Sequence, residues 1–169
     1  MSFRYRVATV FGGSGFIGRH LIKRLAKTGT VIRVATRHPS TANFLRMNGA
    51  VGQIIPIATN INDDASVAAA VQGADIVINL IGILYESGSN TFQGTQADAP
   101  GRIARAAKVA GARRFVQISA IGADANSASA YARTKAAGEQ AVLEAFPEAT
   151  ILRPSIVFGP EDGFFNRFA

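Results

Sequence analysis

The sequence contains no cysteine and only two histidines. Without cysteine there can be no disulfide bonds and no thiolate-ligated metal sites, and thiol usage says nothing about the redox compartment. His20 and His38 are too few for a multi-histidine metal centre. Long apolar runs are also missing, since none approaches the roughly 20 residues that a membrane-spanning helix needs. We therefore expect no metal centre and, at most, peripheral contact with a membrane.

We expect no secretory signal, and we find no internal repeats, linkers or low-complexity segments. Its opening, MSFRYRVATVFGG, has neither a long apolar core nor a small-residue cleavage site. The 169 residues are 48% hydrophobic and 17% charged, which is typical of one compact domain with a sizeable core.

Acidic residues are outnumbered, because 18 Lys and Arg face 11 Asp and Glu, for a formal net charge of +7. Such a balance favours anionic partners, including phosphates, acidic lipid surfaces and nucleic acid. The basic stretch for a nucleic-acid site comprises Arg102, Arg105, Lys108, Arg113 and Arg114. These residues alternate with alanines at helical spacing and lack the aromatic side chains on which single strands stack. A solvated helix face is therefore favoured over nucleic-acid binding, and the same face could also meet acidic lipid or an acidic partner subunit.

Short apolar, β-rich runs alternate with amphipathic or alanine-rich stretches along the whole chain. This alternation is typical of a parallel sheet with crossover helices. The predicted strands are 5–11, 31–36, 53–57, 75–81, 114–119 and 150–152, and the predicted helices are 16–27, 41–47, 65–71, 95–110 and 129–145. The fold class that follows is α/β, a Rossmann-type doubly wound parallel sheet with helices on both faces.

Cap residues agree with these helices. Ser40 and Asp63 stand at N-cap positions, and Pro100 falls inside the fourth helix, which must begin near it or bend there. Glycines expected in the left-handed conformation just past helix ends are Gly29, Gly49, Gly73 and Gly111.

The first predicted strand runs into a glycine loop, FGGSGFIG, with Gly12, Gly15 and Gly18 spaced three apart. In a dinucleotide fold the first glycine permits a tight turn, the second lets the backbone approach a pyrophosphate, and the third lets helix and strand pack closely. Phe16 and Ile17 open the helix whose free N–H groups would receive the phosphates. The alternative is a glycine turn with a structural role alone.

An arginine stands where a fold that prefers NAD places an acid, about 20 residues further on. Arg37 lies in VATRHPS, after the second predicted strand. Its guanidinium can pair in bidentate fashion with the 2′-phosphate of NADP. We therefore favour NADP(H) over NAD(H), with a solvated loop arginine as the alternative; Arg19 would add positive potential to the same site.

Within YARTK, Tyr131 and Lys135 lie one helical turn apart. A phenol with a pKa near 10 is a poor base at pH 7. A lysine on the same face favours the phenolate and can bond the nicotinamide ribose. The pair is thus a candidate acid/base and cofactor-binding set, although such spacing also arises by chance on amphipathic helices.

Three features together, the GxxGxxG loop, the YxxxK pair and LRPSIVFGP after the sixth predicted strand, resemble the extended or atypical short-chain dehydrogenase/reductases, which include NAD-dependent epimerases and dehydratases. The resemblance covers nearly all of the chain. It implies that Asn60 and Ile61 touch adenine, that Leu80, Ile81 and Gly82 lie beside the cofactor, and that Pro154, Ser155 and Ile156 lie along its nicotinamide end.

The chain departs from that family where the substrate is held. Active members carry two adjacent hydroxyl residues after the fifth strand and use the second, whereas here Ser119 is followed by Ala120. Ser119 is the candidate donor to the substrate oxygen. An asparagine that often opens the fourth helix is matched only by Gln96. The resemblance thus implies cofactor binding with an incomplete catalytic network.

Within the family, VFGGSGFIGRHLIKRLAKTGT, DIVINLIGILYE and FPEATILRPSIVFGPED running into FNRFA resemble the A9-type NADPH-binding accessory subunits of respiratory complex I and their bacterial relatives. This implies a structural or assembly role, with complex I subunits and an anionic membrane surface as partners. The alternative is an active NADP-dependent reductase or epimerase/dehydratase acting on a small or nucleotide-linked substrate.

Two expectations about the setting follow from the same resemblance. The opening residues do not suggest a transit peptide, so we expect a cytoplasmic protein, peripheral on the cytoplasmic face of the inner membrane of a bacterium. Family members continue well past Ala169. We therefore expect residues 1–169 to be the NAD(P)-binding Rossmann domain of a longer protein, without its C-terminal substrate region.

Overall fold

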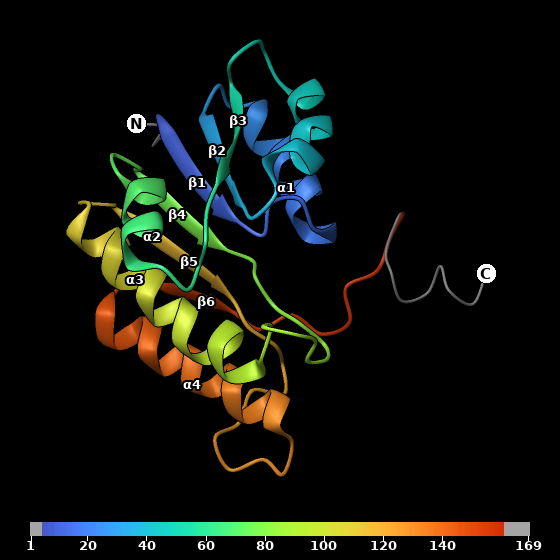
Figure 1. The fold of residues 1–169 in the computed structure, drawn as a ribbon, viewed down its shortest axis with the longest axis vertical. Coiled ribbons are helices and arrows are strands. Elements are labelled where there is room, and N and C mark those ends of the chain that lie inside the picture. The colour runs from blue at the N-terminus through green and yellow to red at the C-terminus, as the bar shows by residue number, and fades with distance from the viewer. Residues whose placement is uncertain (1–4, 161–169) are drawn as a thin grey trace.

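Six parallel strands form the centre of the protein in the computed structural model, which describes residues 5–160 (Figure 1). They are β1 Val7–Phe11, β2 Val31–Thr36, β3 Ile54–Ala58, β4 Ile76–Asn79, β5 Arg114–Ile118 and β6 Thr150–Leu152. Their order is β3-β2-β1-β4-β5-β6. The connections therefore reverse direction between β1 and β4, the switch point where doubly wound sheets bind ligands. The predicted fold class is confirmed.

Helices cover both faces of this sheet (Figure 1). On one face lie α1, Phe16–Ala26, and a 3-10 helix, η1, Pro39–Asn48. On the other lie α2 Asp64–Val71, a π-helical turn η2 Gln93–Asp98, α3 Ala99–Val109 and α4 Ala130–Ala145. Alternate residues of β1 enter the two cores: Ala8 and Val10 pack with the first layer, and Phe11 packs with the second. No helix within residues 5–160 has the length and apolar content needed to cross a bilayer.

Some predicted strands are shorter than expected, because side chains take over backbone groups at their ends. The Asp75 carboxylate accepts the N–H of Arg6 at 2.7 Å and that of Val7 at 3.0 Å, just where β1 begins. The predicted start of that strand at residue 5 was therefore too early. At the carboxyl end of β4, the Asn79 side chain accepts the N–H of Ile81 at 3.1 Å, and the chain turns there.

The cap predictions are right except at η1. Asp63 caps α2 by accepting the N–H of Ser66, and Gly29, Gly73 and Gly111 have φ values of 76°, 66° and 76°. Ser40 is not an N-cap: η1 begins at Pro39, whose missing N–H suits a first helical turn. Gly49 is extended rather than left-handed, with φ of −143°, because its N–H closes a 3-10 turn onto the Arg46 carbonyl.

Pro100 marks the change from the π-helical turn to α3, which begins at Ala99. Of the two predicted alternatives, the helix thus begins near the proline. Proline has no N–H to offer the carbonyl of Gln96 four residues earlier. That carbonyl instead faces α4, where a Cβ on Gly138 would lie only 2.0 Å from its oxygen.

Candidate functional site

The glycine loop lies at the carboxyl end of β1, beside the segment that follows β4. Gly12 has φ of 73°, and a Cβ there would stand 3.1 Å from both the Ile81 nitrogen and the Leu80 carbonyl carbon. A Cβ on Gly18 would lie 2.5 Å from backbone atoms of Gly12 and Gly13. Real Cβ atoms essentially never come within 3.0 Å of backbone, so only glycine fits at residue 18, and at residue 12 the positive φ together with the tight contacts favours glycine. The sequence prediction of a tight turn and a close helix contact is therefore met in the geometry.

The helix α1 begins directly after this loop, and its first backbone N–H groups have no acceptor within the helix. Gly15 occupies the N-cap without a capping side chain, and the first turn of α1 contains no acidic residue. Arg19 is the first residue whose N–H is used within the helix, donating to the Gly15 carbonyl at 3.0 Å. The preceding N–H groups of Phe16, Ile17 and Gly18 are those that a helix amino end offers to an anion. This cradle fits the pyrophosphate of a dinucleotide.

Arg37 follows β2 and is exposed at the same edge of the sheet. Its guanidinium donates to the Asn90 side chain at 3.0 Å, in the connection between β4 and η2. Nearby, the Thr59 N–H donates to the Thr36 carbonyl at 2.8 Å, which continues the pairing of β2 with β3. These two bonds join the loops after β2, β3 and β4 to one another.

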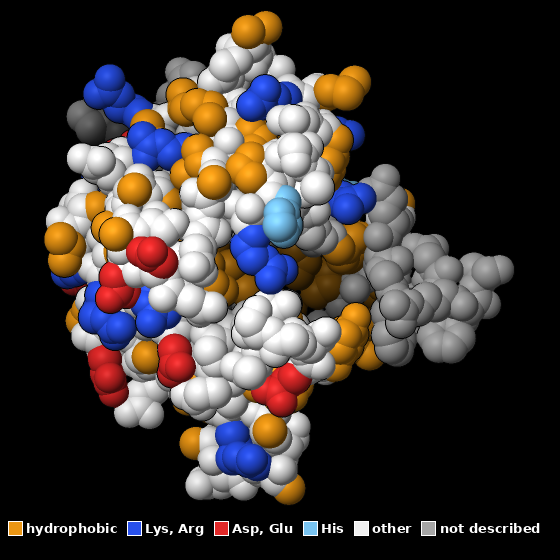
Figure 2. Space-filling model, in the orientation of Figure 1, with side chains coloured by type: hydrophobic (Ala, Val, Ile, Leu, Met, Phe, Trp, Pro, Cys, Tyr) orange, Lys and Arg blue, Asp and Glu red, His pale blue; other side chains and the backbone are white. Residues whose placement is uncertain are grey.

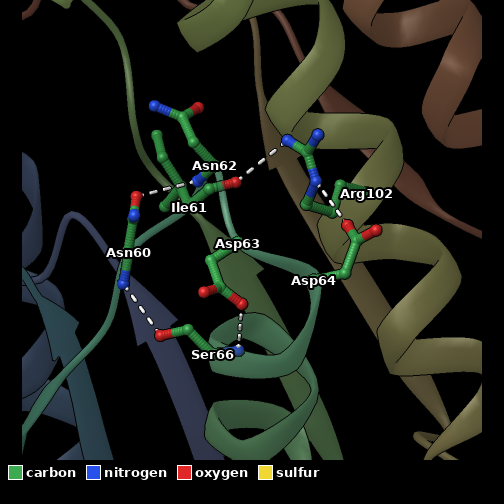
Figure 3. A network of polar contacts seen from close by, with 7 residues as sticks. All are labelled: Asn60, Ile61, Asn62, Asp63, Asp64, Ser66 and Arg102. Carbon is green, nitrogen blue, oxygen red and sulfur yellow. Dashed lines mark hydrogen bonds and ion pairs between the residues drawn. The ribbon is translucent and has the colours of Figure 1, made fainter.

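The β3–α2 loop carries the two residues predicted to touch adenine, and hydrogen bonds fix its shape (Figure 3). The Asn60 N–H donates to Ser66 at 2.9 Å, and the Asn60 side chain accepts the Asn62 N–H at 3.0 Å. Asp63 accepts the Ser66 N–H at 2.9 Å, so loop and helix cap are one network.

Arg102 of α3 holds the other side of this loop (Figure 3). It donates to the Ile61 carbonyl at 3.0 Å and pairs with Asp64 at 2.6 Å. Sequence reasoning had assigned Arg102 to a solvated basic face and missed this contact, which joins residues 41 positions apart.

Two other cations of that basic stretch are also paired. Lys108 lies 3.2 Å from Glu148, and Arg113 lies 3.1 Å from Asp75. Ion pairing leaves less uncompensated charge on and next to α3 for a polyanion to bind.

Tyr131, Lys135 and Gly82 lie together at the carboxyl end of β4. Lys135 is only 7% exposed, and its Nζ would stand 3.0 Å from a Cβ on Gly82. The ammonium lies 5.9 Å from the centroid of the Tyr131 ring, and Phe92 meets that ring edge-on at 5.9 Å. The YxxxK pair therefore faces the predicted cofactor loop rather than solvent.

The two side chains have shifted acidities. Burial lowers the pKa of Lys135 to about 8, against the opposing attraction of Glu139. Burial raises the pKa of Tyr131. The chemistry requires the reverse shift at Tyr131, so the lysine spacing alone does not make this tyrosine a base.

Glu139 and Arg153 form a pair that sequence reasoning missed. Arg153, in the LRPSIVFGP segment, binds the buried Glu139 carboxylate in bidentate fashion, with one N–H at 2.9 Å. Burial acts to raise the pKa of Glu139, but the hydrogen bonds from Arg153, the nearby Ser119 hydroxyl and the charges of Arg153 and Lys135 together hold it below its usual value. The available signal was that Glu139 follows Lys135 by one helical turn.

Two buried polar side chains at this end have no hydrogen-bond partner of normal geometry within residues 5–160. They are Ser119, whose hydroxyl is close enough to influence Glu139, and Gln96, at both its amide nitrogen and oxygen. The Gln96 oxygen would lie 3.7 Å from a Cβ on Gly82, beside Lys135. Buried polar groups are normally satisfied, so these two mark places where a ligand or water would be bound.

The LRPSIVFGP segment lies only partly against this site. The Pro154 carbonyl accepts the Ile121 N–H at 3.0 Å, which holds the segment beside the loop after β5. Ser155 is exposed and Ile156 is 66% exposed, so neither packs among the buried side chains of this cluster. Residues 161–169, including FNRFA, lie outside the described range.

Comparison with known proteins adds a family match and several relatives. The model of the NAD dependent epimerase/dehydratase family matches residues 8–169. The chain is 41% identical over 162 residues to NADH dehydrogenase [ubiquinone] 1 alpha subcomplex subunit 9 of Arabidopsis thaliana, covering 95% of this chain and 40% of the relative. The Mus musculus subunit of that name is 40% identical over 164 residues, covering 96% and 44%. A ceramide reductase of Caulobacter vibrioides is 33% identical over 156 residues, covering 92% and 48%. The chain thus spans less than half the length of each of these relatives.

Solved structures support the fold. A putative NAD-dependent epimerase/dehydratase from Bacillus halodurans has a TM-score of 0.78 at 21% identity, covering 94% of this chain and 74% of that one. A short-chain dehydrogenase/reductase superfamily protein from Agrobacterium tumefaciens with bound NAD has a TM-score of 0.66 at 22% identity, covering 87% and 48%.

Proposed function

Because the chain belongs to the NAD dependent epimerase/dehydratase family, we propose that it binds NADP(H) and serves as an accessory component of respiratory complex I, the NADH:ubiquinone oxidoreductase. The observation that carries this proposal is the 40–41% identity, over at least 95% of the chain, to proteins named as complex I subunits. Its location would then be the cytoplasmic face of a bacterial inner membrane. A dinucleotide that binds only the folded state stabilises that state.

Each part of the cofactor has a matching group at the carboxyl edge. The pyrophosphate would lie on the glycine loop and the amino end of α1, and a 2′-phosphate would pair with Arg37. Lys135 would bind the nicotinamide ribose. When bound, the nicotinamide supplies or accepts a hydride. The remaining proposed contacts are Asn60 and Ile61 at adenine, Leu80, Ile81 and Gly82 beside the dinucleotide, and Pro154 and Ile156 at the nicotinamide end.

Binding without turnover is the better-supported role. Ala120 stands where active family members place their substrate-binding hydroxyl. Burial raises the pKa of Tyr131, which leaves it protonated and a poor base at neutral pH.

A reductase, or an epimerase/dehydratase, is the second candidate, and two observations favour it. One relative at 33% identity is named a ceramide reductase. Ser119 has a buried hydroxyl without a normal hydrogen-bond partner, close to α4. In this role Tyr131 would be the acid/base, Lys135 the group that favours its phenolate, and Ser119 the donor to the substrate oxygen.

Membrane co-purification separates the two functions. We expect the tagged protein to bring down complex I subunits from solubilised membranes, and to release NADP(H) when denatured. Tyr131→Phe removes only the hydroxyl, so an accessory subunit should keep its association, its nucleotide and complex I activity. A soluble protein that reduces substrate and loses that activity in Tyr131→Phe would establish the enzyme instead. A preparation without nucleotide and without NADPH affinity would exclude both.

Arg37→Asp is expected to lower the ratio of NADP to NAD affinity by about 10- to 100-fold, because it replaces a charge-assisted bond of about 1.5–3 kcal/mol by repulsion. Dissociation constants for both dinucleotides, from fluorescence or calorimetric titration, measure the ratio. Asn90→Ala is the control, since it removes the partner of Arg37 without changing charge. A similar loss in both variants would show that Arg37 acts by fixing the loop, and an unchanged ratio in Arg37→Asp would refute its phosphate role.

A further inference from the structure

Acidic residues are distributed very unevenly along the chain. Residues 1–62 contain none of the 11 Asp and Glu but 9 of the 18 Lys and Arg. That part carries a formal charge of +9, and the remainder, with nine cations and eleven anions, carries −2. In the fold, residues 5–62 supply β1, α1, β2, η1 and β3, so one helical layer and one side of the sheet carry basic but no acidic side chains.

The exposed side of α1 concentrates this charge. His20, Lys23, Arg24 and Lys27 follow the i, i+3, i+4, i+7 spacing of one helix face and line a surface groove. None of the four forms an ion pair within residues 5–160, whereas three cations on or next to α3 do. The helix dipole favours cations in the last turn of α1. It does not explain why these cations have no acidic partners within the described residues.

Two large apolar side chains are exposed on the segments that adjoin α1. Met47, near the end of η1, is 90% exposed, and Val51, in the turn before β3, is fully exposed. Gln53 ties that turn to the end of α1, since its side chain donates to the Ala26 carbonyl at 2.7 Å and accepts the Ala50 N–H at 2.8 Å. Figure 2 shows hydrophobic and basic side chains together over the η1 end of the molecule, while acidic ones gather over the α2, α3 and α4 half.

We propose that this surface, defined by His20, Lys23, Arg24, Lys27, Met47 and Val51, docks on a bilayer that contains anionic phospholipids. Basic side chains are attracted to acidic headgroups, and apolar side chains that project among them enter the interface. Nucleic acid would be held by the charges alone and gives no reason for the exposure of Met47 and Val51.

Apart from His20, which packs against Phe16 at the start of α1, the docking surface and the candidate cofactor site lie at opposite ends of the sheet. The end of α1 and the turn at residues 49–53 precede β2 and β3, whereas the glycine loop follows β1. A docked protein can therefore bind a dinucleotide at the same time. The proposal rests on the membrane location proposed above and identifies the surface that would contact the membrane. Vesicle binding tests it separately from NADPH binding and complex I association.

Co-sedimentation of the protein with vesicles of phosphatidylcholine and phosphatidylserine, in a ratio of about 7 to 3, provides the test. We expect the partition coefficient to fall about 100-fold in the variant that combines Lys23→Gln, Arg24→Gln and Lys27→Gln, since each cation near an anionic surface raises the partition coefficient roughly fivefold. The matched control combines Arg105→Gln, Lys108→Gln and Arg114→Gln, which removes equal charge from the other half and should bind close to wild type.

A second variant tests the apolar contribution. Met47→Ser combined with Val51→Ser should lower the partition coefficient about tenfold while the salt dependence stays unchanged. Circular dichroism and NADPH affinity should match wild type in every variant. An equal loss in both charge variants would show that net charge alone governs binding, and would overturn the proposal. The proposal would also be overturned if the protein bound DNA or an acidic subunit but did not bind these vesicles.

Discussion

Replacing Gly138 by alanine is expected to lower the melting temperature by about 6–12 °C, equivalent to about 3 kcal/mol. The added Cβ would lie 2.0 Å from the Gln96 carbonyl oxygen, and neither helix can accommodate it without a shift of backbone. Alanine is a better helix former than glycine by about 1 kcal/mol. Propensity alone therefore predicts the opposite sign, and the experiment distinguishes the two effects.

Gly122→Ala is the matched control. A Cβ at Gly122 would meet no heavy atom within 4 Å, and its backbone is outside the left-handed region. We expect a change within about 0.5 kcal/mol there. Thermal and urea unfolding followed by circular dichroism measure both variants. If Gly138→Ala is as stable as Gly122→Ala, then α4 does not approach the π-helical turn as closely as described.

The sheet was largely predictable because each strand is a short local signal. β2 and β6 begin and end where the apolar runs predict. The errors arise where a side chain or a proline replaces a regular backbone bond. Asp75 takes the N–H groups at the start of β1, and Pro39 moves the start of η1 ahead of Ser40.

The candidate site likewise combines local features, which the sequence predicts, with long-range contacts, which it does not. The glycine loop and the Tyr131–Lys135 spacing depend on neighbours within a few residues, so the sequence predicts their geometry. The contacts of Arg37 with Asn90 and of Arg102 with Ile61 join residues 53 and 41 positions apart. Sequence periodicity does not predict contacts between residues so far apart in the chain, because these contacts depend on how the strands are ordered in the sheet.

Lys135→Met is expected to raise the stability of the nucleotide-free protein by about 3 kcal/mol at pH 7 and to weaken NADPH binding at least about tenfold. Burial lowers the pKa of Lys135 from 10.5 to about 8. The folded protein therefore bears the full cost of a buried ammonium below about pH 8. Methionine fills similar space without charge.

The dependence on pH has a definite sign. Between about pH 8 and 10.5 the unfolded chain keeps the Lys135 proton while the folded protein loses it, so wild-type stability rises with pH in that window. Above it both states are neutral and the cost disappears. The advantage of Lys135→Met over wild type should thus be greatest below pH 8 and vanish near pH 10.5.

Urea unfolding across this pH range measures the difference, with the exposed Lys23→Met as control, for which we expect less than about 0.5 kcal/mol. NADPH titration of the same proteins measures binding. A variant that is less stable than wild type at pH 7 would mean that Glu139 and its surroundings stabilise the ammonium more than burial disfavours it. A variant with wild-type NADPH affinity would instead remove Lys135 from the cofactor site. The two expected results together would show a buried charge that destabilises the empty fold because the dinucleotide requires it.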